Sequence, residues 1–129
     1  MIYTVEFTGV LPTFNQYSAL ERTNRLKAAE VKRQVQDGLL RQMTDAKSFN
    51  GHVYVGFVWI RPDMRYDKDN VTFAKKFILD ALQEAHVIKN DSWRMCTPFD
   101  LGYKVNKQNP RTIVRIADTL EEIYGDTHA

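Results

Sequence analysis

The sequence of 129 residues is poor in cysteine, proline and glycine, with one, four and six of each. Because Cys96 is the only cysteine, an internal disulfide is excluded, and we expect this thiol to be a small buried hydrophobic group in a reducing compartment. The longest apolar run, residues 53–60, is too short to cross a bilayer. The first residues lack the pattern of a secretory signal. We therefore expect a cytoplasmic protein without a membrane anchor.

Two common functional motifs are also absent. The sequence has no glycine-rich loop that could hold the phosphates of a nucleotide, which argues against an NTPase. His52, His86 and His128 are scattered and lack the spacing of zinc ligands. Hydrophobic residues make up 43% of the chain and aromatic residues 12%, which is enough to bury one core. We expect a single domain over residues 1–129, in which residues 118–129 form an acidic tail.

The net charge of +2 hides an uneven distribution along the chain. The tail contains Asp118, Glu121, Glu122 and Asp126 and has no lysine or arginine. Residues 1–117 therefore hold all 18 basic residues against 12 of the 16 acidic ones, an excess of six positive charges. A basic body of this kind suits a polyanionic partner. Lysines and arginines scattered over a solvated face are the simpler interpretation.

Hydrophobic periodicity predicts the elements of a mixed α/β structure. Tyr3, Val5 and Phe7 alternate with polar residues, as in a half-buried strand. Residues 53–60 are apolar on both alternating faces, which is typical of a central strand covered on both sides. In order, we expect a strand at 2–8, a helix at 18–44, a strand at 53–60, a helix from Asp69 or Asn70 to about Ala85, and strands at 99–105 and 112–117. This β-α-β-α-β-β order predicts an α+β domain, a mixed sheet flanked by two helices.

The most informative stretch is Asp67-Lys68-Asp69-Asn70, which is followed two dozen residues later by Asp91. Clustered carboxylates need a counter-charge at neutral pH, and a hard divalent cation with oxygen ligands supplies it. A Mg²⁺ ion held beside a lysine, on a chain with a basic body, suits phosphodiester hydrolysis. This chemistry requires the three aspartates to converge in space.

The predicted helix after Asp69 would bring a lysine close to these carboxylates. At about 100° per residue, Lys76 and Asp80 fall on the same stripe as Asp69, whereas Lys75 points away from it. We expect Asp80 to pair with Lys76, four residues earlier, and to hold its side chain in place. A capped helix followed by a solvated row of charges is an equally good interpretation of this spacing.

A set of spaced residues runs through most of the chain. Its members are Pro12, Asn15 and Tyr17, then Asp67, Asp69 and Asn70, then Lys76, Asp80, Ala81, Leu82 and Ala85, and finally Asp91. This pattern resembles the RusA family of Holliday junction resolvases, in the form found in phages and Gram-positive bacteria, over residues 2 to 117. The resemblance implies a small α+β fold, a homodimer, and Mg²⁺-dependent cutting of branched DNA, specifically four-way junctions.

The resemblance also implies roles for individual residues. The implied metal ligands are Asp67, Asp69 and Asp91. The implied essential lysine is Lys76, which would stabilise charge on the scissile phosphate or orient the attacking water. Better-known members carry this lysine three residues after the asparagine, where Phe73 stands here, so Lys75 is an alternative. The family often has two adjacent acids at the last position, and here Asn90 precedes the aspartate.

Four basic residues are our candidates for contacts with DNA phosphates, although each could equally be an ordinary surface charge. They are Arg22, Arg25, Lys32 and Arg33. Trp93 is expected to pack in the core. A four-way junction needs two matched incisions, which a dimer with twofold symmetry would provide. Three other functions fit the sequence: a Mg²⁺ nuclease acting on other branched or single-stranded DNA, a non-catalytic DNA-binding module, and a structural dimerisation protein.

Overall fold

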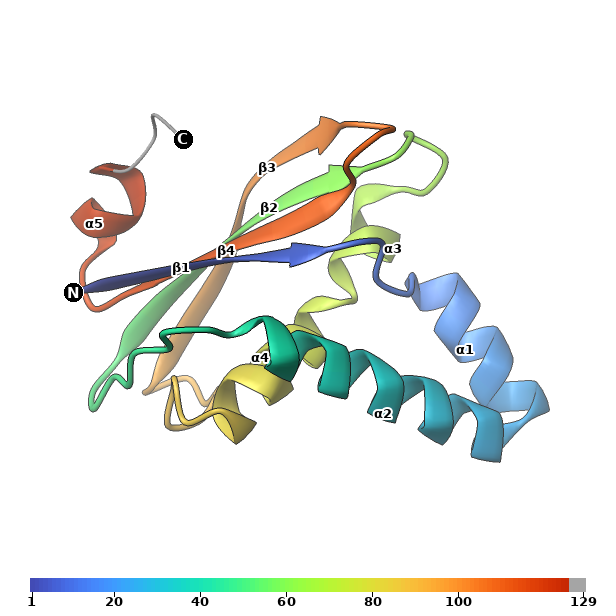
Figure 1. The fold of residues 1–129 in the computed structure, drawn as a ribbon, viewed down its shortest axis with the longest axis horizontal. Helices are drawn as coiled ribbons and strands as arrows, with labels where there is room; N and C mark the ends of the chain where they lie inside the picture. Colours follow the sequence, from blue (N-terminus) through green and yellow to red (C-terminus); the bar gives the residue numbers. More distant parts are fainter. Residues whose placement is uncertain (126–129) are drawn as a thin grey trace.

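A computed structural model describes residues 1–125, which form one four-stranded mixed sheet packed against helices (Figure 1). The elements are β1 (Ile2–Thr8), α1 (Phe14–Thr23), α2 (Arg25–Gln42), β2 (Val53–Arg61), α3 (Lys68–Thr72), α4 (Lys75–Glu84), β3 (Cys96–Val105), β4 (Arg111–Ala117) and α5 (Leu120–Gly125). Over this part of the chain, no helix combines the length and apolar character that crossing a membrane requires. The predicted α+β class with a mixed sheet is confirmed.

The strands lie in the order β1-β4-β2-β3. Strand β4 runs antiparallel to both of its neighbours, whereas β2 and β3 are parallel. The parallel register aligns Val53 with Cys96 at the start of the pair and Arg61 with Val105 at its end. The segments that follow β2 and β3 therefore leave the sheet at the same end of these strands, and the segments that precede them enter at the other end.

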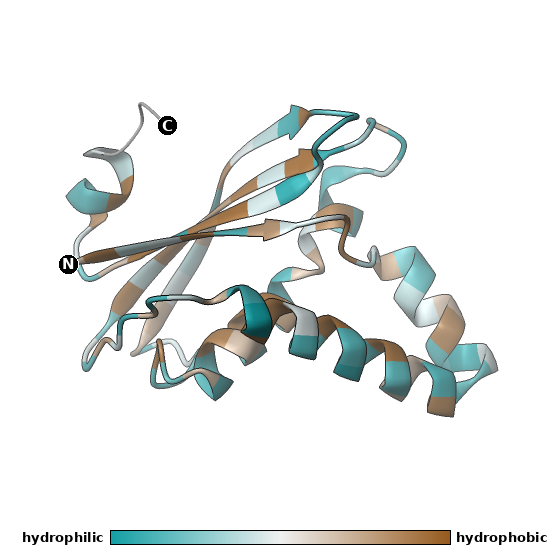
Figure 2. Ribbon diagram, in the orientation of Figure 1, coloured by the Kyte–Doolittle hydropathy of each residue, from teal (hydrophilic) through white to brown (hydrophobic). Residues whose placement is uncertain are grey.

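The main core lies between one face of the sheet and the helices α2 and α4 (Figure 1). Hydrophobic residues recur along these helices and along the strands, separated by hydrophilic ones (Figure 2). Phe57 and Trp59 of β2 stack with ring centroids 5.3 Å apart. Ile78 and Leu82 of α4 are completely buried in the same cluster. As predicted for residues 53–60, β2 has buried residues on both faces, with Phe57 on one and Ile60 on the other.

Helix α5 packs on the opposite face of the sheet, where it contacts β2 and β4. Its Ile123 is completely buried. A Cβ atom at Gly56 would lie 2.6 Å from Leu101 Cδ1 and 3.3 Å from Ile123 Cγ2. Glycine at this position of β2 therefore leaves the space into which Leu101 and Ile123 pack.

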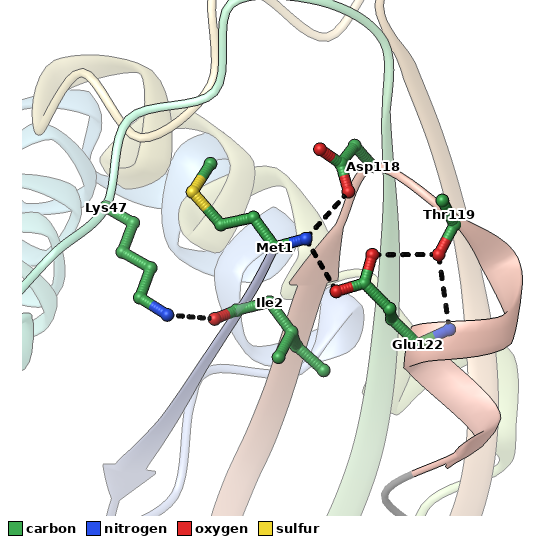
Figure 3. Close-up of polar contacts among 6 residues, drawn as sticks. All are labelled: Met1, Ile2, Lys47, Asp118, Thr119 and Glu122. Atoms are coloured by element: carbon green, nitrogen blue, oxygen red, sulfur yellow. Dashed lines mark hydrogen bonds and ion pairs between the residues drawn. The ribbon is translucent and has the colours of Figure 1, made fainter.

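The acidic tail is attached to the first strand by charged contacts (Figure 3). The amino group of Met1 lies 3.1 Å from Asp118 Oδ1 and 2.6 Å from Glu122 Oε2. Hydrogen bonds to Glu122 and Asp118 raise the pKa of this amino group above its usual value. As far as Gly125 the tail is a folded part of the domain, and Asp126 and His128 lie outside the described residues.

The single helix predicted over residues 18–44 is wrong, because the structure has two helices there. Asn24 is extended (φ −157°, ψ 90°) and separates α1 from α2. Its backbone N–H donates to Leu20 O (2.8 Å), and its side-chain oxygen accepts from the N–H of Lys27 (3.0 Å). One asparagine therefore caps both helices. The first helix also begins earlier than predicted, because Thr13 and Gln16 form a capping box.

The helix predicted from Asp69 or Asn70 to Ala85 is also divided in two, at Phe73 and Ala74. Across this junction Lys76 N–H donates to Phe73 O (3.2 Å) and Phe77 N–H to Ala74 O (3.1 Å). These bonds span three residues, as in a 3₁₀ turn, so the chain is wound more tightly than an α-helix. The N-cap of α3 is Asp67, two or three residues earlier than predicted.

Candidate active site

A cavity of about 590 Å³ opens where β2 and β3 end. Trp59 and Tyr103 form part of its wall, and Asp67, Lys68 and Asp69 lie at its border. The ammonium group of Lys68 lies 4.7 Å from the centroid of the Tyr103 ring. The cavity thus combines aromatic walls with charges of both signs, and the two aspartates of the sequence motif are part of it.

The side chains of Asp67 and Asp69 keep most of their oxygen lone pairs free. Both residues are exposed, and both also line a second cavity of about 620 Å³. The Asp67 side chain makes no capping hydrogen bond, although it occupies the N-cap of α3. Asp69 Oδ1 accepts one hydrogen bond, from the N–H of Asn70 (3.0 Å). Neither carboxylate takes part in an ion pair within residues 1–125. Such oxygens suit a hard divalent cation.

Asn70 connects this site to the start of α1. Its side-chain oxygen accepts a hydrogen bond of 2.9 Å from the backbone N–H of Asn15. Gln16, the next residue of α1, donates through Nε2 to the hydroxyl of Tyr66 (3.3 Å). Two parts of the sequence pattern that lie 55 positions apart are therefore in direct contact. This contact fixes α3, and with it the two aspartates, against α1.

Asp91 lies at the opposite end of the sheet. It belongs to the loop before β3, and its negative charge adds to the burial that raises the pKa of the Cys96 thiol to about 11. Cys96 is the first residue of β3, whereas Asp67 and Asp69 follow the end of the parallel strand β2. The paired strands run from Val53 to Arg61, and the eight steps between these residues, at about 3.3 Å each, separate the two ends by roughly 26 Å.

One copy of the chain therefore does not bring the three aspartates together, contrary to the expectation of convergence. Across residues 1–125, no group of three or more histidine, cysteine, aspartate or glutamate side chains could hold a metal ion. The parallel direction of β3 is the physical reason. The chain must return along α4 before β3 begins, and Asp91 lies at the far end of that return. The assignment of all three aspartates as metal ligands stays a prediction.

The two candidate lysines differ in their surroundings. Lys75 Nζ lies 3.0 Å from the carboxylate of Asp100 and 5.7 Å from the centroid of the Phe57 ring. Lys76 is exposed, with Nζ 5.9 Å from the Phe73 ring centroid. The ion pair that we expected between Lys76 and Asp80 is not found among the described residues. Both residues lie within α4 and are exposed, and solvent weakens the attraction between exposed charges enough that such a pair need not form.

Sequence reasoning missed Asp100 in β3. Its Oδ1 accepts a hydrogen bond of 2.8 Å from the indole N–H of Trp59, and the same carboxylate pairs with Lys75. Trp59 is only 2% exposed, so Asp100 provides the partner for an indole N–H in the wall of the cavity. The one signal for it in the sequence is an acidic residue within a strand that is otherwise uncharged from Cys96 to Tyr103.

The four predicted DNA contacts are all exposed, and they lie on two helices. Arg22 is in the last turn of α1 and Arg25 begins α2, so these two lie on either side of the bend at Asn24. Lys32 and Arg33 lie farther along α2 beside a cavity of about 400 Å³, which Asp80 and Glu84 also line. Their role in binding stays a prediction.

The prediction that Trp93 packs in the core is wrong. Its side chain is 99% exposed, in the same loop as Asp91. The five residues from Lys89 to Trp93 contain no hydrophobic residue other than this tryptophan, so the loop has no apolar face to bury it.

Comparison with known proteins is consistent with this architecture. The family model described as Endodeoxyribonuclease RusA matches residues 12–117. The matched region begins before α1, includes both parts of the motif joined by Asn15 and Asn70, and ends with β4. A search of curated proteins gives no match. Because the family model covers most of the chain, the protein belongs to the RusA family of endodeoxyribonucleases.

Proposed function

We propose that this protein is a Mg²⁺-dependent endonuclease that resolves four-way DNA junctions by paired phosphodiester hydrolysis. The observation that supports it most strongly is the pair of exposed aspartates, Asp67 and Asp69, at the border of two cavities in a chain of the RusA family. Their oxygens have few partners within the fold, so their arrangement is better explained by a ligand than by a structural role.

Asp67 and Asp69 would hold the metal from one side. The described contacts of these residues fit such a role, because two hard oxygen donors at the start of one helix are largely free of hydrogen bonds. Bound Mg²⁺ would make water a better nucleophile and would offset negative charge on the phosphate. Asn70 holds α3 against α1 and thereby keeps both carboxylates in position.

A second copy of the chain would supply Asp91. A single copy presents Asp67 and Asp69 at one end of the β2–β3 pair and Asp91 at the opposite end. A dimer with twofold symmetry makes reciprocal contacts, so Asp91 of each copy can approach Asp67 and Asp69 of the other. The same symmetry produces two equivalent sites, which suits two matched cuts in a junction.

Lys76 is the better candidate for the lysine that contacts the scissile phosphate. Its ammonium group is exposed and has no carboxylate partner in the described part of the chain. Lys75 pairs with Asp100, which favours a supporting role for it in the cavity wall. An unpaired ammonium group can stabilise charge that develops on a phosphate oxygen.

Cleavage of a panel of labelled DNAs tests the proposal: a four-way junction, a flap, a duplex and a single strand, each with and without Mg²⁺. We expect paired incisions in the four-way junction, only with the metal. Asp69→Asn should abolish cutting and retain junction binding, because it removes a metal ligand and one negative charge that faces DNA. Asp45→Asn is the matched control, with the same change of charge in the loop after α2.

Equal cutting of the flap or single strand would favour a nuclease for other branched or single-stranded DNA. Normal junction cutting by Asp69→Asn in Mg²⁺ would contradict the assignment of this residue. Binding without any cutting, unaffected by replacement of Asp67, would indicate a DNA-binding module.

A further inference from the structure

Arg115 of β4 is a buried cation without a visible partner. Val114 and Ile116 on either side of it point into the main core, so Arg115 points to the opposite face of the sheet. It is only 7% exposed, and its Nε has no hydrogen-bond partner. No ion pair within residues 1–125 includes it.

An unpaired guanidinium in this position is unfavourable for the fold. Arginine stays protonated in proteins, so it cannot escape the cost of burial by losing its charge. A buried charge without a partner destabilises the folded state strongly, and buried arginines are normally paired with a carboxylate or a phosphate. Arg115 is therefore suited to bind an anion that comes from outside the described residues.

The surroundings of Arg115 also favour an anion. It lines a cavity of about 380 Å³ together with Lys104 of β3 and Arg111 of β4. Among residues 1–125, Glu6 is the only carboxylate that lines this cavity, and it accepts a hydrogen bond of 2.8 Å from Arg111 Nε. Lys104 and Arg115 are left without an acidic partner, which gives the cavity an excess of two positive charges.

This cavity is next to the candidate active site. Lys104 and Val105, at the end of the edge strand β3, line both the cavity of Arg115 and the cavity of Asp67 and Asp69. A polyanion that leaves the aspartates and crosses the end of β3 would meet Lys104 before Arg115, which lies farther along the sheet. A small free anion would not need two adjoining cavities.

We infer that Arg115, with Lys104, binds a backbone phosphate of DNA on the sheet face opposite α2 and α4. The planar guanidinium can donate two parallel hydrogen bonds to phosphate oxygens. This inference rests on the proposed function for the identity of the polyanion. The phosphate chemistry itself follows from the unpaired cation and the cavity.

The salt dependence of DNA binding tests this site. All variants carry Asp69→Asn to prevent cutting, and their affinities for a four-way junction are measured from 50 to 300 mM KCl. Adding Arg115→Met should reduce the slope of log K against log salt by about 0.9, the value for one lost phosphate contact. Lys104→Met reports on the same cavity and should also reduce it. Arg41→Met makes the same change at an exposed position of α2 and should leave the slope unchanged.

Thermal unfolding in inorganic phosphate distinguishes DNA from a free anion. We expect Arg115→Met to unfold at the same or a higher temperature than the parent in chloride, because it removes an unpaired buried charge. Failure of this variant to fold, or an unchanged salt slope for it and for Lys104→Met, would overturn the inference. If phosphate stabilises the parent and not Arg115→Met while DNA binding is unchanged, the site is one for a free anion, and the DNA assignment is overturned. Cutting of junctions by the wild type is measured separately, so failure of the nuclease proposal can be told apart from failure of this one.

Discussion

Replacement of Asp100 should reveal which contacts hold the wall of the candidate active-site cavity. Its carboxylate pairs with Lys75 at 3.0 Å and accepts the indole hydrogen bond of Trp59 at 2.8 Å. The side chains of Lys75 and Asp100 are 24% and 26% exposed, so solvent weakens their attraction to about 0.5–1 kcal/mol. The indole N–H is buried, and leaving such a group unpartnered costs about 1–3 kcal/mol.

These two contributions predict different effects for two substitutions. Asp100→Asn retains an oxygen for Trp59 and loses only the ion pair, so its free energy of unfolding should fall by less than about 1 kcal/mol. Asp100→Ala loses both interactions, so its free energy of unfolding should fall by about 1.5–4 kcal/mol. Urea unfolding at pH 7 measures both values, and Lys75→Met completes a double-mutant cycle for the pair.

Equal losses for the asparagine and alanine variants would refute this reasoning, because the indole hydrogen bond would then contribute nothing. A coupling energy well above 1 kcal/mol between Lys75 and Asp100 would show that solvent does not screen the ion pair.

Experiments on Trp93 and Cys96 test the surroundings of Asp91. Trp93→Ala should change the free energy of unfolding by less than about 0.5 kcal/mol, because the side chain is exposed, and a loss of about 3–5 kcal/mol in urea would show that it is buried. The Cys96 thiol, with a pKa of about 11, should react slowly with a disulfide reagent at pH 8 in the folded protein and rapidly in urea. Because its folded pKa is raised, stability should decline as the pH rises from about 8.5 towards 11, and Cys96→Ala should remove that decline.

The strands could be predicted from the sequence because their signal is local. The alternation of Tyr3, Val5 and Phe7 defines β1 with the bounds that the structure has. The helix boundaries were predicted less well because they depend on contacts between distant residues. Phe73, at the break between α3 and α4, packs against Phe14 and Tyr17 of α1, and no periodicity in either segment encodes that contact.

The site was predictable where its residues are neighbours in the sequence. Asp67 and Asp69 border the same cavities because they are two positions apart at the start of one helix. The position of Asp91 was not predictable, because spacing does not reveal whether the strand that follows runs parallel or antiparallel to β2. Asp100 was missed for a related reason: its partners, Trp59 and Lys75, meet only through strand pairing and helix packing.

A mixed dimer tests the shared carboxylate set most directly. Asp69→Asn and Asp91→Asn copies carrying different affinity tags are produced together, and the dimer that holds one of each is purified. If each site takes two aspartates from one copy and Asp91 from the other, this dimer has one intact site of two. We predict that each variant alone is inactive, whereas the mixed dimer nicks junctions in Mg²⁺ at about half the wild-type rate, in one strand. A mixed dimer that binds junctions and never nicks them, or a chain that stays monomeric, would contradict a site shared between two copies.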